Sequence, residues 1–148
     1  MEPIQPGTEA PPIPGAKLDG PMALLFYKVT CPTCQMAVPP AERLHRAFAD
    51  RFVAVAQDPE GRVREFAEEY GASFSSVSDL GSYDLSNAYG IRSVPTLFVL
   101  NEGRVDDVVE SWDREGWNRA AERLGDLVGV SAAPVSQEGD GLPPFRPG

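Results

Sequence analysis

The sequence predicts an α/β fold in which a central mixed β-sheet is flanked by helices. Short apolar runs alternate along the chain with segments of helical periodicity, and the last two apolar runs are separated by a hairpin turn. The chain has 148 residues, of which 42% are hydrophobic, which is enough for one core. We therefore expect one domain over residues 21–130, preceded by a Pro-rich N-terminal arm (1–20) that lies on it. The last stretch, 131–148, has few apolar groups and is expected to be a disordered tail.

The first elements are a strand and a long helix. Residues 23–29 form a continuous apolar run, typical of a central strand that is buried on both faces. Residues 37–48 then carry Ala, Leu and Phe at helical spacing. Pro39-Pro40 lies inside this stretch and predicts a kink in the helix.

A second strand and helix follow. Residues 52–56 are again apolar and predict a buried strand. Asp58 and Pro59 are expected to be the N-cap and first residue of a helix, and Gly71 is expected to end it.

The remaining elements complete the sheet. A weak strand at 74–78 and a short helix ending at Gly90 precede two apolar runs, 96–100 and 105–109, which flank a hairpin-turn composition. The sheet therefore ends with an antiparallel pair. An amphipathic helix over 117–128 should cover one face.

Charge and hydropathy exclude several classes of function. There are 13 Lys and Arg against 22 Asp and Glu, with no basic cluster, so we expect no binding to nucleic acid or to an anionic membrane. The apolar runs fall far short of the ~20 residues needed to cross a bilayer. The first residues show no signal-peptide pattern, so a cytoplasmic location is expected.

The only two cysteines are Cys31 and Cys34, at Cys-x-x-Cys spacing. A disulfide between them closes a very short loop and constrains little of the unfolded chain, so redox exchange is a better interpretation than a structural bridge. The alternative is half of a zinc site with His45 as a third ligand. A closed zinc site needs four ligands, and a second Cys or His pair is missing, so we expect no metal.

The position of the motif assigns different roles to the two thiols. Cys31 stands where a helix begins, and unpaired backbone N–H groups there favour the thiolate, which makes Cys31 the expected nucleophile. Pro32 suits the first helical position. Cys34, one turn further in, is the expected resolving thiol. Lys28 is a candidate for additional positive potential near the sulfur.

Two motifs in this order resemble the thioredoxin superfamily. They are Cys31-Pro32-Thr33-Cys34 after a buried strand, and Ser93-Val94-Pro95-Thr96 before a later strand. The extra strand and helix between them, and the Pro-rich start, are similar to the TlpA/ResA or redoxin (AhpC/TSA-type) branch. The resemblance implies a thioredoxin-like fold with a strand–helix insertion before the cis-Pro loop.

The resemblance also implies a site. In the family the proline of the second motif is cis and faces the Cys-x-x-Cys, so Val94 and Pro95, together with Pro32 and Thr33, are the expected substrate-binding residues. The implied function is thiol-disulfide exchange with protein substrates, with no cofactor, supported by a redox partner such as a thioredoxin-type reductase. We expect a monomer.

Three positions depart from the family pattern. Thr30 replaces the Trp that usually precedes the first cysteine, Leu25 replaces the buried acid of thioredoxins, and Ala37 replaces the Glu of ResA-like proteins. Both familiar routes for the proton of the second thiol are therefore absent.

Two other functions remain open on the sequence. One is a peroxiredoxin-like thiol peroxidase, although Lys28 stands where those enzymes place Thr or Ser. The other is a non-catalytic thioredoxin-like module for redox sensing or docking.

Overall fold

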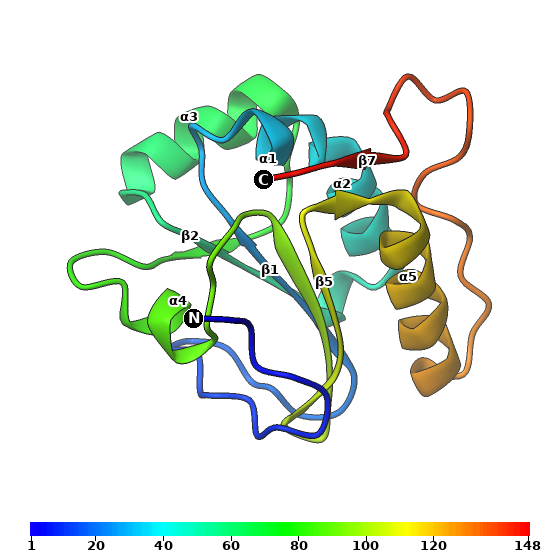
Figure 1. The fold of residues 1–148 in the computed structure, drawn as a ribbon, viewed down its shortest axis with the longest axis horizontal. Helices are drawn as coiled ribbons and strands as arrows, with labels where there is room; N and C mark the ends of the chain where they lie inside the picture. Colours follow the sequence, from blue (N-terminus) through cyan, green and yellow to red (C-terminus); the bar gives the residue numbers. More distant parts are fainter.

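The computed structural model describes residues 1–148 as an α/β fold (Figure 1). A five-stranded sheet in the order β3-β2-β1-β4-β5 forms its centre, and a second sheet joins only β6 and β7. β1 pairs in parallel with β2 and antiparallel with β4, so the central sheet is mixed, as predicted. The elements, in chain order, are β1 (Met22–Tyr27), α1 (Pro32–Met36), α2 (Val38–Ala47), a 3-10 turn (Ala49–Arg51), β2 (Phe52–Ala56), α3 (Glu60–Tyr70), β3 (Ser76–Ser78), α4 (Asp84–Ala88), β4 (Thr96–Asn101), β5 (Arg104–Glu110), β6 (Trp112–Asp113), α5 (Arg114–Val128) and β7 (Phe145–Arg146).

Strand β1 is the central strand of the sheet, and every one of its residues is buried. Successive side chains point to opposite faces, so β1 contributes to two apolar clusters. The larger cluster is formed with α1, α2, α3 and α5, and includes Leu25, Leu44, Phe66 and Trp117. The smaller one is formed with the N-terminal arm and the residues after α4, and includes Ile13, Leu24, Tyr89 and Ile91.

The predicted hairpin joins β4 to β5. Glu102 and Gly103 occupy its turn, both with positive φ, at 52° and 73°. Two such residues match the handedness of a two-residue hairpin turn, and Gly at the second position adopts it without steric cost.

The N-terminal arm packs on the domain, as expected. Its backbone bonds to the hairpin and to the loop after α4, as in Ile4 N to Tyr89 O at 3.1 Å and Gly7 N to Val105 O at 2.8 Å. The Tyr89 hydroxyl donates to the carbonyl of Pro11, and Ile13 is buried. The arm is therefore part of the second core.

Two predicted details of the helices are wrong. The expected single kinked helix is two helices, because the chain breaks at Ala37, and the prolines take early positions of α2, where a missing N–H costs nothing. Helix α3 has Pro59, not Asp58, as its N-cap, and no side chain caps it. Asp58 is turned toward Val29 instead, whose backbone N–H it accepts at 2.9 Å.

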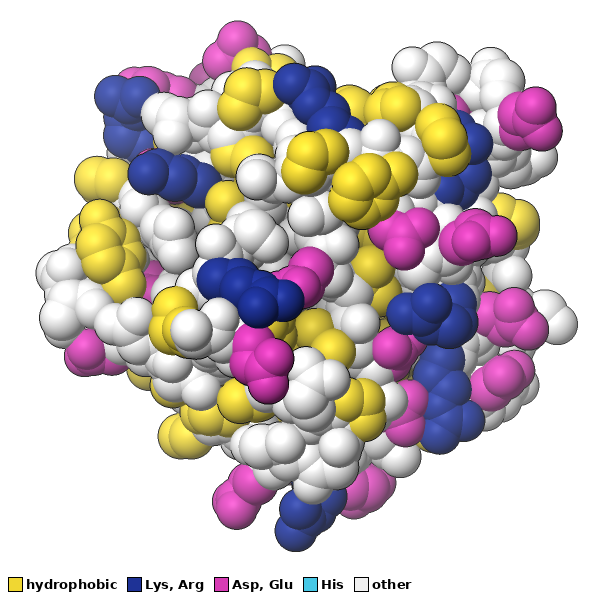
Figure 2. All heavy atoms as spheres, viewed as in Figure 1, with side chains coloured by type: hydrophobic (Ala, Val, Ile, Leu, Met, Phe, Trp, Pro, Cys, Tyr) yellow, Lys and Arg dark blue, Asp and Glu magenta, His cyan; other side chains and the backbone are white.

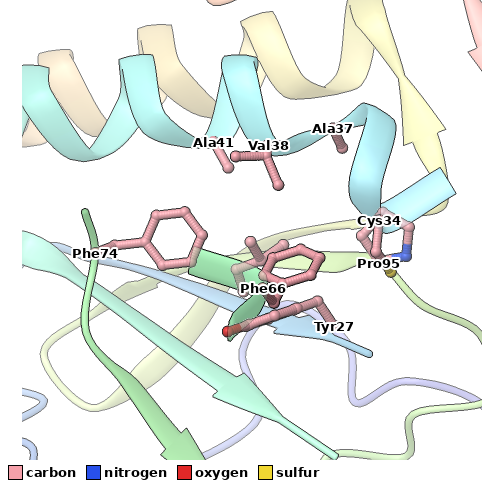
Figure 3. A pocket seen from close by; sticks show the side chains of 9 residues that line it. Tyr27, Cys34, Ala37, Val38, Ala41, Phe66, Phe74 and Pro95 are labelled. Carbon is pink, nitrogen blue, oxygen red and sulfur yellow. The ribbon is translucent and has the colours of Figure 1, made fainter. Parts of the chain in front are cut away.

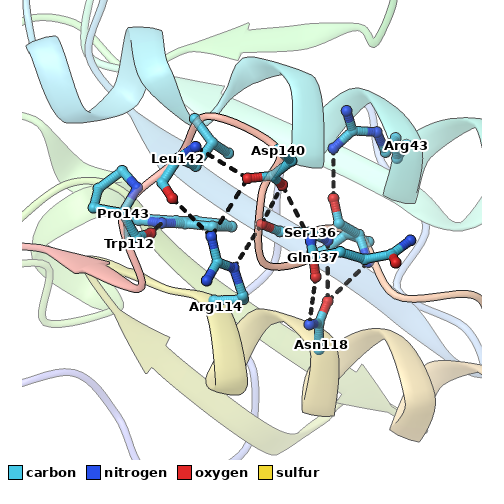
Figure 4. A network of polar contacts seen from close by, with 10 residues as sticks. Arg43, Trp112, Arg114, Asn118, Ser136, Gln137, Asp140, Leu142 and Pro143 are labelled. Atoms are coloured by element: carbon cyan, nitrogen blue, oxygen red, sulfur yellow. Dashed lines mark hydrogen bonds and ion pairs between the residues drawn. The ribbon is translucent and has the colours of Figure 1, made fainter.

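The C-terminal tail (131–148) differs from the disordered segment expected from composition. It runs along α5 and returns across the end of the sheet, where β7 pairs with β6 (Figure 1). Polar side chains of α5 hold it: Asn118 bonds the backbone of Val135 and Ser136, and Arg114 bonds Ser136, Asp140 and Leu142 (Figure 4). Hydrogen bonds from the domain thus replace the apolar surface that the tail lacks.

Acidic and basic side chains are interspersed on the face shown in Figure 2. Three arginines pair with acids of β5, namely Arg92 with Glu110, Arg119 with Asp107 and Arg123 with Asp106. The acidic stretch of β5 is therefore a solvated face with paired charges. No helix is long and apolar enough to cross a membrane.

Candidate active site

Cys31 lies at the junction between β1 and α1. It is the N-cap residue of α1, with φ of −82° and ψ of 115°, and its sulfur accepts the backbone N–H of Cys34 at 3.1 Å. Pro32 follows at the start of the helix, as predicted, and is exposed. The Cys31 side chain is partly exposed, so its sulfur is accessible to small reagents in solution.

Hydrogen bonds make Cys31 the more acidic thiol of the pair. The hydrogen bond from the Cys34 thiol to the Cys31 sulfur has the largest effect and lowers the pKa of Cys31. Partial burial raises this pKa, and the backbone N–H groups of Cys34 and Thr33 lower it further. The net result lowers the pKa of Cys31 to about 6. Arg146, in β7, adds a smaller favourable charge. The predicted contribution of Lys28 is not among these effects, and its side chain is exposed.

Cys34 is in the opposite environment. It is only 4% exposed and lines a small apolar cavity with residues of β1, α1, α2, α3 and the loop before β4 (Figure 3). Burial raises the pKa of Cys34 far above its usual range, and the hydrogen bond to Cys31 raises it further. Cys34 therefore stays protonated while Cys31 is a thiolate.

The cavity also holds two of the positions where the sequence departs from the family pattern. Leu25 and Ala37 line it, and eight of its nine lining residues are hydrophobic. Neither position brings a carboxylate to Cys34, as the sequence indicated.

The Val94–Pro95 loop faces the motif. The Val94–Pro95 peptide bond is cis, Pro95 lines the cavity beside Cys34, and the Cys31 sulfur lies 3.4 Å from the Val94 carbonyl oxygen, to which it donates when it is protonated. The two motifs, far apart in sequence, are thus brought together around the two sulfur atoms.

Thr33 is placed differently from the other predicted substrate-binding residues. Its side chain is 3% exposed, and its hydroxyl donates to the carbonyl of Pro147, in the tail, at 2.8 Å. The sequence offered no signal for this contact, because composition alone marked the tail as unstructured.

One buried acid near the site escaped the sequence reasoning. Asp58, 7% exposed, accepts the Val29 N–H two residues before Cys31, and its charge contributes to the raised pKa of Cys34. A carboxylate thus reaches this region from the end of β2 rather than from Leu25 or Ala37. Asp58 was interpreted as a helix cap because the residue pair Asp-Pro is typical of a helix start.

His45 takes no part in the site. Its ring packs against Phe52 and Phe74, with centroids at 5.6 and 6.2 Å, at the edge of the core. No group of three or more His, Cys, Asp or Glu side chains is arranged to hold a metal ion.

The comparisons with known proteins agree with this geometry. Residues 7–108 match the model of the AhpC/TSA family. The chain belongs to the AhpC/TSA family. The chain is also similar to two curated proteins. It is 36% identical over 83 residues to the thiol-disulfide oxidoreductase ResA of Halalkalibacterium halodurans, a match that covers 53% of this chain and 47% of ResA. It is 28% identical over 123 residues to the thioredoxin-like protein YneN of Bacillus subtilis, covering 71% of each.

A solved structure that is similar in sequence to this chain has the same fold. The structure of MTB dsbF in its mixed oxidized and reduced forms is 26% identical, with a TM-score of 0.63 over 72% of this chain and 83% of dsbF. The predicted thioredoxin-like fold and the ResA-like resemblance are therefore confirmed. Residues 109–148, which include the tail, lie beyond the part that the family model matches.

Proposed function

We propose that this protein is a thiol-disulfide oxidoreductase that exchanges disulfides with protein substrates through Cys31 and Cys34. One observation carries the proposal: Cys31 is the partly exposed N-cap of α1 and its sulfur accepts the Cys34 N–H at 3.1 Å, whereas Cys34 is only 4% exposed. These surroundings lower the pKa of Cys31 to about 6 and raise that of Cys34. A nucleophile must be a thiolate at neutral pH, whereas a resolving thiol must wait until the first bond has formed.

The reaction follows from this difference. The Cys31 thiolate attacks one sulfur of the substrate disulfide, which forms a mixed disulfide and releases the other sulfur as a thiolate. Cys34 then loses its proton and attacks the Cys31 sulfur, so the substrate leaves as a dithiol and a Cys31–Cys34 disulfide remains. Two electrons pass from the protein to the substrate, and the substrate sulfurs take up the proton of Cys34 and one proton from solvent. The reverse sequence oxidises a dithiol substrate.

Substrate binding is assigned to the surface around Cys31. Val94 presents its carbonyl beside the Cys31 sulfur at 3.4 Å, and Pro32 is exposed next to it. An extended substrate segment can pair with backbone groups at such a place with little sequence selectivity. Pro95 and Thr33 shape this surface from beneath, since both are buried.

Two assays test the proposal against the peroxidase and non-catalytic alternatives. The wild-type protein should reduce insulin disulfides with dithiothreitol as the electron source, and Cys31→Ser should abolish this. Peroxide consumption should stay at the level of Cys31→Ser. Rapid peroxide turnover without insulin reduction would instead favour the peroxidase, and neither activity would favour a docking module.

The remaining assignments concern context. The proposed partners are protein thiols and disulfides and a reductase or reductant that recycles the Cys31–Cys34 disulfide. A monomer in the cytoplasm is proposed from the sequence, and sedimentation and cell fractionation test these two points.

A further inference from the structure

The end of the tail lies on the surface to which substrate binding is assigned. Gly148 packs against the backbone of Val94 so closely that a Cβ on Gly148 would be 1.7 Å from the Val94 carbonyl oxygen. That carbonyl oxygen lies 3.4 Å from the Cys31 sulfur. The Pro147 carbonyl accepts the Thr33 hydroxyl at 2.8 Å, and the Gly148 N–H donates to the Ser111 hydroxyl at 3.2 Å. An extended segment running past Val94 would need the same space.

The mode of attachment is that of an added strand. β7 pairs antiparallel with β6, Trp112 opposite Arg146 and Asp113 opposite Phe145. The Trp112 indole N–H donates to the Pro143 carbonyl at 2.7 Å (Figure 4). Main-chain pairing of this kind is also how extended peptides dock on sheet edges.

The two halves of the tail are held very differently. Residues 135–142 form a fixed base, in which Val135 and Ser136 are buried and the Asp140 carboxylate accepts from Ser136, Gln137 and Leu142. Residues 144–148 are exposed and are attached mainly through backbone groups. Pro143, Pro144 and Pro147 have no N–H to add to the pairing. Segments with exposed hydrogen bonds and little buried apolar surface open at low free-energy cost.

From these contacts we propose that residues 143–148, the tail strand, occupy the substrate-binding surface around Cys31 and Val94 as an internal competitor, which a protein disulfide must displace before its sulfur reaches Cys31. The inference rests on the proposed function, because that function makes the surface around Cys31 a substrate-binding surface. Its physical content is independent of turnover: a segment packed on Val94, beside the partly exposed Cys31, swings away on a fixed base. Large substrates are then slowed by the tail strand, whereas small thiol reagents are not.

Two variants remove the tail strand from the substrate-binding surface. The first ends the chain at Leu142 and keeps the base. The second, Gly148→Val, leaves every other residue in place and forces the end of the strand away from Val94. The matched control is Glu138→Ala, at an exposed position in the base.

The measurement is the rate of Cys31 alkylation with a bulky polyethylene-glycol maleimide and with iodoacetamide, at pH 8. At this pH a thiol with a pKa of about 6 is ionised, so the loss of Arg146 in the shortened chain does not affect the comparison. We expect both variants to react at least about fivefold faster with the bulky reagent, which corresponds to ~1 kcal/mol. With iodoacetamide the change should be under about twofold on the same scale, and Glu138→Ala should match the wild type with both reagents.

Insulin reduction by the same proteins separates this inference from the proposed function. Equal maleimide rates for the wild type and both variants overturn the inference, even where the wild type reduces insulin. A faster maleimide reaction in both variants supports the inference. If neither the wild type nor any variant reduces insulin, the proposed function is contradicted while the maleimide result still stands.

Discussion

Replacing Cys34 by Ala should raise the pKa of Cys31, because the Cys34 thiol is the strongest single contributor to its low value of about 6. A hydrogen bond to a charged group contributes ~1.5–3 kcal/mol, and one pKa unit corresponds to ~1.36 kcal/mol. Because Cys31 is partly exposed, we take the lower end of this range and expect a rise of about one unit. Cys34→Ser is the matched control, since a serine hydroxyl still donates to the thiolate.

The assay is the rate of iodoacetamide alkylation as a function of pH. At pH 6 the thiolate fraction of Cys31 falls from about one half to about one tenth in Cys34→Ala, while at pH 9 both proteins are ionised. The ratio of the Cys34→Ala rate to the wild-type rate should therefore rise about fivefold between these pH values, whatever the intrinsic nucleophilicity of the two thiolates. A wild-type midpoint near the ~8.5 of free cysteine, or identical midpoints in wild type and Cys34→Ala, would refute this electrostatic account.

Three further predictions concern stability, each measured by urea unfolding. Asp58→Ala should cost ~1–3 kcal/mol, because the Val29 N–H loses its only acceptor in a buried site, whereas Asp58→Asn keeps an acceptor and should cost less; equal losses would contradict the argument. Gly90→Ala should destabilise by at least ~1 kcal/mol, because Gly90 has a φ of +70° and an added Cβ would meet the backbone of the N-terminal arm; an unchanged midpoint would show that the arm is not held there. Burial raises the pKa of Glu42, but hydrogen bonds, led by those from Ser73, lower it by more. The stabilisation by the Glu42 carboxylate is therefore present above its unfolded pKa and is lost as the pH falls through the lower folded pKa. Glu42→Gln should flatten the loss of stability below about pH 4.3, and an unchanged slope would count against this role.

Much of the fold was predictable because local signals agreed with the tertiary structure. The continuous apolar run of β1 requires burial on both faces, and Gly71 ends α3 as the sequence suggested, in a left-handed conformation. Cys31 and Cys34 were predictable from their spacing and their place at a helix start, and the Val94–Pro95 loop from its resemblance to a known motif.

The parts that sequence reasoning missed depend on contacts across long separations. Asp58 has a good local role as a helix cap, and only the fold shows that Val29, 29 residues away, takes its carboxylate instead. The tail is poor in apolar residues, and its order depends on Arg114 and Asn118 of α5, which could not be paired with it in advance. Composition measures the apolar surface a segment can bury, not the hydrogen bonds that another element offers it.

The different roles of the two thiols are the centre of this account, and mixed-disulfide capture tests them most directly. Each single Cys→Ser variant is mixed with a protein disulfide, quenched in acid and analysed by intact mass. Cys34→Ser should retain the substrate on Cys31, because the exposed thiolate attacks and no second thiol releases the product. Cys31→Ser should form no adduct, because Cys34 is 4% exposed and protonated. Equal capture by both variants, or capture by Cys31→Ser alone, would contradict the assignment of Cys31 as nucleophile and Cys34 as resolving thiol.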